Sequence, residues 1–178
     1  MELIDALLDL TKSVAQPVIA IDGPAGAGKT TLASHLSAAL SGKYRCTTVH
    51  MDQIYNGWKT PFDSTFTDAL LRVVKAHKSE RQIPLAQFNW QLGEYEESQL
   101  LEMSQLLILE GVASSHSLIR DEITVSLWID IEPAIGLQRV LARDGASISD
   151  EMNNWLSLQA QHFATHDSQM RADFVLTT

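Results

Sequence analysis

The sequence has little cysteine and few basic residues. Its single cysteine, Cys46, excludes an intramolecular disulfide, and no Cys/His spacing indicates a zinc site. The 13 Lys and Arg residues are outnumbered by 22 Asp and Glu residues, which gives a net charge of −9. This balance argues against nucleic-acid partners and an anionic membrane surface, because both require a basic face. Any phosphate that the protein binds must therefore be held by a local site.

Long apolar segments are also missing. No run approaches the roughly 20 residues that a membrane-spanning helix needs. The N-terminal segment MELIDALLDLTKSV lacks the basic start of a signal peptide, and its apolar positions share one helical face, which predicts a packed amphipathic helix. We expect a soluble, cytoplasmic protein. A chain of 178 residues, 45% of them hydrophobic, has room for one substantial core, so we expect a single domain over 1–178.

The segment IAIDGPAGAGKTTLASHL, residues 19–36, has the spacing of a phosphate-binding loop, Gly23-x-x-x-x-Gly28-Lys29-Thr30. In such a loop, backbone N–H groups surround a polyphosphate at the N-terminus of a helix. Lys29 would reach the β and γ phosphates of ATP, and the Thr30 hydroxyl would ligate Mg²⁺. An apolar β-branched run precedes the loop and a helical pattern follows it. The predicted nucleotide-binding residues are Gly23, Pro24, Ala25, Gly26, Ala27, Gly28, Lys29, Thr30 and Thr31.

Strand and helix patterns alternate along the rest of the chain. Strands are predicted at 18–21, 44–52, 105–111, 123–131 and 172–178, with helices at 66–77, 133–143 and 152–163. The tract 84–97 is expected to be irregular, and a short helix is expected over 97–103. This order predicts an α/β fold of the P-loop type, a doubly wound parallel sheet of about five strands flanked by helices. Ligands bind beyond the C-terminal ends of such strands, where the glycine-rich loop, Asp52 and Glu110 all fall.

The remaining features narrow the class of P-loop protein. No asparagine is followed by lysine, so the Asn-Lys-x-Asp tract of a GTPase is missing. The chain is short for a transport or remodelling ATPase. A small-molecule kinase fits the length; it needs a carboxylate near the acceptor hydroxyl and mobile arginines that close over the transferred group.

Three segments carry a resemblance to a known family. HMDQIY, LILEG and LQRVLARDG resemble the uridine kinase-like branch of the P-loop nucleoside kinases. The resemblance implies that Asp52 is the general base, that Tyr55 lines the acceptor pocket and that Glu110 organises Mg²⁺. It also implies that Arg139 and Arg143 clamp the phosphates.

The resemblance further implies a small lid around 139–150. The chain departs from the family pattern at Gln53, in the tract TPFDSTFTD, which lacks the uracil-binding histidine, and at Asp144-Gly145, where the lid end is not basic. These departures leave the acceptor open.

Several of these residues also have a structural interpretation. Asp52 could cap a turn, and Arg139 and Arg143, four residues apart, could lie on a solvated helical face. A carboxylate at Glu110, ending an apolar strand, needs a metal, a charge or donors to offset its burial. Trp58 and Trp90 could stack on a planar acceptor or pack in the core.

Other residues are expected to have structural roles. Trp128 and Trp155 are predicted to lie in the core, and Asp22 to support the glycine-rich loop from behind. The histidines are scattered and support no site. His162 and His166 are four residues apart and could ligate a metal, but a solvated helix end is the preferred interpretation.

The favoured function is ATP-dependent phosphotransfer to a hydroxyl of a nucleoside-sized metabolite. A kinase for a nucleoside monophosphate or another metabolite remains an alternative; it would need further basic residues, for which Lys59, Arg72 and Arg81 are the nearby candidates. A regulatory module that binds nucleotide without transfer is the third hypothesis, and Lys29, Thr30, Asp52 and Glu110 together weigh against it.

Overall fold

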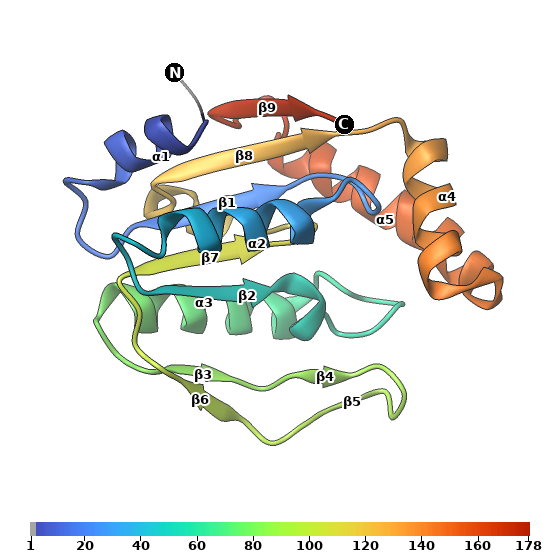
Figure 1. Ribbon diagram of the computed structural model, residues 1–178. Coiled ribbons are helices and arrows are strands. Elements are labelled where there is room, and N and C mark those ends of the chain that lie inside the picture. The colour runs from blue at the N-terminus through green and yellow to red at the C-terminus, as the bar shows by residue number, and fades with distance from the viewer. Residues whose placement is uncertain (1–2) are drawn as a thin grey trace.

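A parallel sheet of five strands forms the centre of the computed structural model, which describes residues 3–178 (Figure 1). The strand order is β2-β7-β1-β8-β9, and every neighbouring pair is parallel. The strands are β1 Val18–Asp22, β2 Cys46–His50, β7 Leu106–Glu110, β8 Val125–Asp130 and β9 Phe174–Thr177. All residues of β1 and β7 are buried, as expected for central strands covered on both faces. The predicted α/β fold is confirmed.

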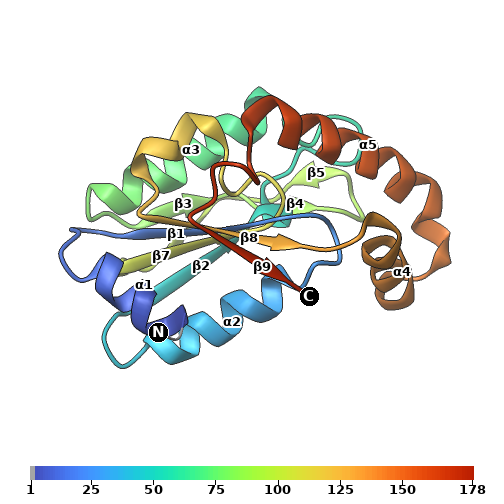
Figure 2. The same cartoon turned by 90° about the horizontal axis from the view of Figure 1, so that it is seen from above.

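Helices cover both faces of the sheet. Figure 2 shows α1 and α2 on one face and α3 and α5 on the other, with α4 at the end of the sheet. The helices are α1 Leu3–Thr11, α2 Lys29–Leu40, α3 Ser64–Lys78, α4 Pro133–Asp144 and α5 Ser149–His166, with 3₁₀ turns η1 Met51–Gln53, η2 Ser117–Glu122 and η3 Ala146–Ile148. A separate hydrophobic cluster fills the space on each side of the sheet.

α3 illustrates how the sequence defines these helices. The Asp63 carboxylate caps it by accepting from the backbone N–H groups of Thr65 at 2.9 Å and Phe66 at 3.3 Å. Its apolar residues recur on one face, where Phe66, Leu70, Val73 and Val74 are buried against the sheet. The sequence pattern therefore predicted both this helix and the face that it buries.

The segment between α3 and β7 forms an antiparallel arm outside the main sheet. β3 Ile83–Leu85 pairs with β6 Gln99–Leu101, and β4 Phe88–Asn89 pairs with β5 Glu94–Tyr95. The predictions of an irregular tract over 84–97 and a short helix over 97–103 were wrong. Leu100 is exposed, and antiparallel pairing with β3 supplies the backbone hydrogen-bond partners that a helix would have supplied.

The structure corrects one further boundary and confirms the N-terminal helix. β2 ends at His50, and Asp52 lies in the following turn η1 rather than in the predicted strand 44–52. The N-terminal helix is present as α1, and its Leu7 is fully buried. None of the helices in the described part of the chain combines the length and the apolar character that a membrane crossing requires.

Candidate active site

The glycine-rich loop connects β1 to α2 and packs tightly against its neighbours. A Cβ atom at Gly23 would lie 2.4 Å from the carbonyl oxygen of Ile129, and one at Gly26 would lie 2.2 Å from that of Gly136. Both glycines also have positive φ angles, 139° and 79°. Glycine is therefore required at these positions for space and for backbone conformation. The first-turn N–H groups of α2 lack intrahelical acceptors and face the loop end, which makes them available to an anion.

Asp22 supports the loop from behind, as predicted. Its carboxylate accepts from the N–H groups of Gly23 at 2.8 Å, Ala113 at 3.1 Å and Ser115 at 3.1 Å, and from the Ser115 hydroxyl at 2.6 Å. Burial raises the pKa of Asp22, and the hydrogen bonds from Ser115 and Gly23 oppose that rise. The carboxylate thus joins the start of the loop to the segment after β7.

Lys29 begins α2 and is only 8% exposed. Its Nζ donates to the carbonyl oxygens of Gly23 at 2.8 Å and Pro24 at 2.7 Å, so the ammonium group is bound to the backbone of the loop. Burial lowers the pKa of Lys29 to about 8, while the negative charges of Asp22 and Glu110 oppose the shift. The amine therefore stays largely protonated at neutral pH, in the place where a phosphate charge would be bound.

Glu110, at the end of β7, accepts two side-chain contacts although it is only 4% exposed. The Thr30 hydroxyl donates to its Oε1 at 3.1 Å, and Nδ1 of His50 contacts the same oxygen. This hydrogen bond to Glu110 is the main cause that raises the pKa of His50. A hydroxyl and a carboxylate side by side are oxygen ligands of the kind that Mg²⁺ prefers, so Thr30 and Glu110 fit the predicted metal.

His50 is a site residue that the sequence analysis missed. It is the last residue of β2 and also the N-cap of the turn η1, so the capping role considered for Asp52 falls on His50. Parallel pairing places His50 directly opposite Glu110, which is how the two side chains meet. A polar residue at the end of a predicted strand beside the phosphate loop was the available signal.

Asp52 lies in η1 and lines the same pocket, with its side chain exposed. The surrounding protein raises the pKa of its carboxyl by desolvation, and the negative charge of Glu110 raises it further. Two carboxylates with different surroundings thus face one cavity: Glu110 is buried and paired, whereas Asp52 is accessible from the pocket.

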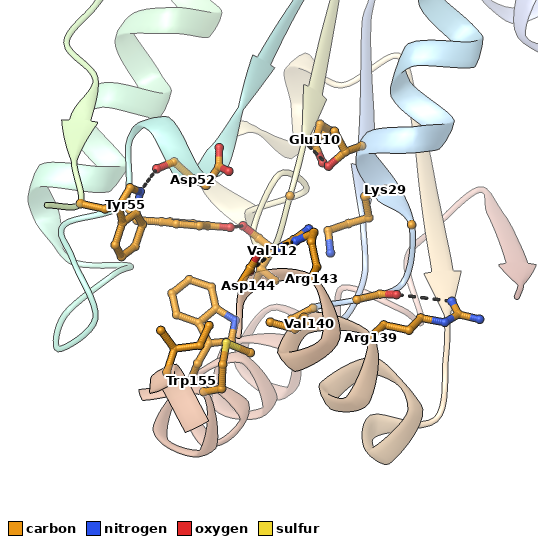
Figure 3. A pocket seen from close by; sticks show the side chains of 18 of the residues that line it. Lys29, Asp52, Tyr55, Glu110, Val112, Arg139, Val140, Arg143, Asp144 and Trp155 are labelled. Carbon is orange, nitrogen blue, oxygen red and sulfur yellow. Dashed lines mark hydrogen bonds and ion pairs between the residues drawn. The ribbon is translucent and has the colours of Figure 1, made fainter. Parts of the chain in front are cut away.

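The pocket has a volume of about 500 Å³ and joins the phosphate loop to an aromatic wall (Figure 3). Trp58 packs edge-to-face on Trp90 and on Trp155, with ring centroids 5.0 and 5.9 Å apart. Trp155 was predicted to lie in the core; it is 5% exposed but also lines this pocket. Tyr55 belongs to the wall through its ring, because its hydroxyl donates to the carbonyl oxygen of Val112 at 2.8 Å.

The two α4 arginines line the pocket but point in different directions (Figure 3). Arg143 turns toward the pocket and pairs with Asp144 through two bonds of 2.7 Å. Arg139 turns toward the end of β9, where it donates to Thr178 Oγ1 and to the Gly26 carbonyl oxygen, both at 3.4 Å. In this arrangement the two guanidinium groups do not converge on one point, and the lid over 139–150 stays a prediction.

The expectation that the histidines are scattered was wrong. His116, in the loop after β7, lies together with His162 and His166 of α5. His162 is buried rather than solvated, because the face of α5 that carries it packs onto the loop and onto Phe62. Sequence spacing relates His162 to His166, but only the fold brings His116 to them.

The sheet order, the glycine-rich loop and its lysine define a P-loop protein with a kinase-like fold. A family model described as an AAA domain matches residues 19–154, and the chain belongs to this AAA-domain family. No curated protein matches the sequence.

Two solved structures of similar fold are a protein provisionally named a uridine kinase, from Bacillus stearothermophilus, and one provisionally named a fructose transport system kinase, from Silicibacter sp. TM1040. They are 20% and 17% identical to this chain, and each has a TM-score of 0.70. Each alignment covers 97% of this chain and 96% of the other. The resemblance to uridine kinase-like proteins is thus confirmed at the level of the fold.

Proposed function

We propose that the protein transfers the γ-phosphoryl group of ATP to a hydroxyl group of a nucleoside or a similar small metabolite. One observation carries this proposal: a single pocket joins the glycine-rich loop, the Thr30–Glu110 pair, Asp52 and an aromatic wall. The names of the two similar structures agree with it, since one is provisionally called a uridine kinase and the other a fructose transport system kinase.

Asp52 is proposed to act as the general base. Its carboxylate accepts the proton of the acceptor hydroxyl while the oxygen forms a bond to the γ-phosphorus, and the bond from that phosphorus to the leaving ADP breaks. Lys29 neutralises charge on the transferred group, and Arg143 is placed to do so after leaving Asp144. Mg²⁺, held by Thr30 and Glu110, would supply charge neutralisation at the phosphates.

The pocket favours an uncharged, planar acceptor. Trp58, Trp90 and Trp155 offer aromatic surface beside Asp52, and such rings stack on flat ligands. A monophosphate acceptor would need additional cations near this wall. The candidates from the sequence, Lys59, Arg72 and Arg81, are exposed and are not among the residues that line the pocket. This arrangement supports a nucleoside over its monophosphate.

The proposal is tested by an acceptor panel. Purified protein with ATP and Mg²⁺ is offered nucleosides, nucleoside monophosphates and sugars, and ADP formation is measured. We expect turnover with at least one hydroxyl acceptor and a loss of about 100-fold or more in Asp52→Asn, the range of general-base catalysis. ATP binding without transfer to any acceptor, and unchanged behaviour of Asp52→Asn, would instead indicate a nucleotide-binding regulatory module.

A further inference from the structure

Three imidazole rings form a cluster between α5 and the loop after β7, outside the proposed kinase pocket. His116, His162 and His166 each offer a ring nitrogen, and these atoms all lie within 4.8 Å of one another. The ring centroids are 4.1 Å apart between His116 and His166, and 4.4 Å apart between His162 and His166. Neutral imidazole is the commonest protein ligand of transition metals.

His162 provides the second observation that points to a ligand. Its side chain is 6% exposed, and its buried Nε2 has no hydrogen-bond partner among the described residues. A buried polar atom without a partner costs free energy, so a native structure that keeps one requires an explanation. Burial lowers the pKa of His162 to about 3 and that of His116 to about 4, which leaves both imidazoles neutral at pH 7.

The other two histidines make hydrogen bonds that limit which of their ring nitrogens can bind a metal. Nδ1 of His166 lies 2.7 Å from the Ser117 hydroxyl, which can accept from it and so leave Nε2 with a free lone pair. Nδ1 of His116 accepts from the N–H of Leu118 at 3.1 Å. Metal binding at that lone pair would release the Leu118 amide, which makes this amide a reporter of the site.

The cluster connects two segments that both support the glycine-rich loop. His116 directly follows Ser115, whose N–H and hydroxyl donate to Asp22. His162 lies one helical turn after Gln159, whose Oε1 accepts from the N–H of Ala25 at 3.1 Å. A ligand that binds both His116 and His162 would therefore fix α5 to the loop after β7, whose Ser115 donates to Asp22.

We propose that His116, His162 and His166 bind a divalent transition metal, with Zn²⁺ the first to test, and that this metal fastens α5 behind the glycine-rich loop. Zn²⁺ binds imidazole nitrogen at about 2.0–2.1 Å, so the three rings, which are now tilted against one another by 36–44°, must draw together and turn. The Arg120 guanidinium donates to the His166 carbonyl oxygen, and its positive charge, which lowers the pKa of His116 and His166, disfavours a cation at the site. The inference is independent of the proposed kinase reaction.

The test uses the whole protein, freed of metal by a chelator and then dialysed. Co²⁺ is titrated while the visible absorption of its complex is followed, and Zn²⁺ is then added as a competitor. We expect one metal per chain, displacement of Co²⁺ by Zn²⁺, and a higher melting temperature with metal. In an amide NMR spectrum, the Leu118 signal should shift on addition of Zn²⁺.

His166→Ala is the main variant, because His166 is only half-buried and its loss leaves the core intact. The matched control is His35→Ala, an exposed histidine of α2. Metal affinity should fall by about 100-fold or more in His166→Ala, beyond the roughly 10–100-fold lost when a residue that only hydrogen-bonds to a ligand is changed. It should stay unchanged in His35→Ala. His162→Asn, checked for folding by circular dichroism, should behave like His166→Ala.

Absence of binding to the folded wild-type protein would overturn the proposal. Equal losses in His166→Ala and His35→Ala would also overturn it, since they would indicate adventitious binding at the surface. Neither result would bear on phosphotransfer, which is measured separately with Mg²⁺, a cation that prefers oxygen ligands.

Discussion

At the residue scale, Lys29 has the most demanding position in the proposed site. It is a buried cation held by two loop carbonyl oxygens, and no neutral side chain can replace its charge at a transferred phosphate. We expect Lys29→Ala to lose at least about 100-fold to 1000-fold in turnover, the cost of removing one preorganised charge-stabilising donor. ATP affinity, measured by calorimetry, should fall as well.

The control for Lys29→Ala is Lys43→Ala, which removes an exposed lysine after α2. Both variants lose one positive charge, so a general electrostatic effect would reduce activity equally in the two. Wild-type turnover in Lys29→Ala would mean that the loop is not the site of transfer.

The raised pKa of Asp52 leads to a prediction about how the reaction rate depends on pH. Desolvation and the charge of Glu110 raise its pKa above the ordinary value, and the base must be ionised to accept a proton. The rate constant kcat/KM should therefore fall as pH decreases through this raised pKa, at a higher pH than an ordinary aspartate would give. Asp52→Asn should lower kcat by about 100-fold or more and abolish this acid limb.

If Asp52 only orients the acceptor hydroxyl, the Asp52→Asn variant should give a different result. Phosphoryl transfer has a loose transition state, so a base also contributes by positioning the hydroxyl. If Asp52 only positions the acceptor, Asp52→Asn keeps much of the hydrogen bonding and most of the rate. ATP affinity should barely change in either case, and a large change would place Asp52 in the nucleotide site instead.

Site residues could be predicted from the sequence when their partners are close along the chain. They were missed when their partners are distant. Lys29 and Thr30 belong to a local pattern whose spacing is fixed by one turn, so they could be named directly. His50 was missed because its meaning depends on Glu110, 60 residues away and brought opposite it by strand pairing. A single sequence contains no record of such a pair.

At the element scale, α4 packs directly against the glycine-rich loop. A Cβ atom at Gly136, within α4, would lie 2.5 Å from the carbonyl oxygen of Ala25, and backbone atoms cannot give way easily. Gly136→Ala should thus push the helix from the loop. We expect a loss of about 1–3 kcal/mol in the free energy of unfolding, typical of overpacking, together with weaker ATP binding. Denaturant unfolding and calorimetry measure the two effects.

Gly42→Ala provides the matched control. A Cβ atom at Gly42 would meet nothing within 4 Å, and no positive φ constrains that residue. Its unfolding free energy should stay within about 0.5 kcal/mol of the wild type, as for most surface changes. If Gly136→Ala and Gly42→Ala prove equally mild, α4 is not held closely against the loop in solution.

The elements also show where periodicity predicts structure and where it does not. α3 and the central strands were predicted because their apolar spacing matches the faces they bury. β6 was mistaken for a helix because three residues are too few to show alternation, and its pairing with β3 is not encoded locally. The histidine cluster was missed for the related reason that packing of α5 on the loop after β7 creates it.

At the scale of the whole molecule, parallel strand order explains how the site assembles. β1, β2 and β7 are neighbours in the sheet and end at the same edge, so the glycine-rich loop, Asp52 and Glu110 meet there. This convergence could be predicted from general rules of α/β folds. The aromatic wall could not, because it combines Trp58, the arm residue Trp90 and Trp155 of α5, which no sheet rule relates.

The arrangement leads to a last prediction, that residues 3–178 unfold as one cooperative unit. The four tryptophans report on different parts of the fold: Trp58, Trp90 and Trp155 lie at the pocket, whereas Trp128 lies in β8. Because α5 packs against the loop after β7 and also lines the pocket, the fold should unfold as one unit. Tryptophan fluorescence and circular dichroism should then give the same melting temperature. Saturating ATP and Mg²⁺ should raise it, since they bind only the folded state.

The size of that shift follows from linkage. At a nucleotide concentration of about 100 times Kd, stabilisation is roughly 2.7 kcal/mol. For a domain of this size, each kcal/mol shifts the melting temperature by about 2–4 °C, so a rise of roughly 5–10 °C is expected. Lys29→Ala should show little of this rise while melting in one transition. Separate transitions by fluorescence and circular dichroism would mean that the arm and α5 form a unit that unfolds independently of the sheet, and the pocket between them would then not be preformed.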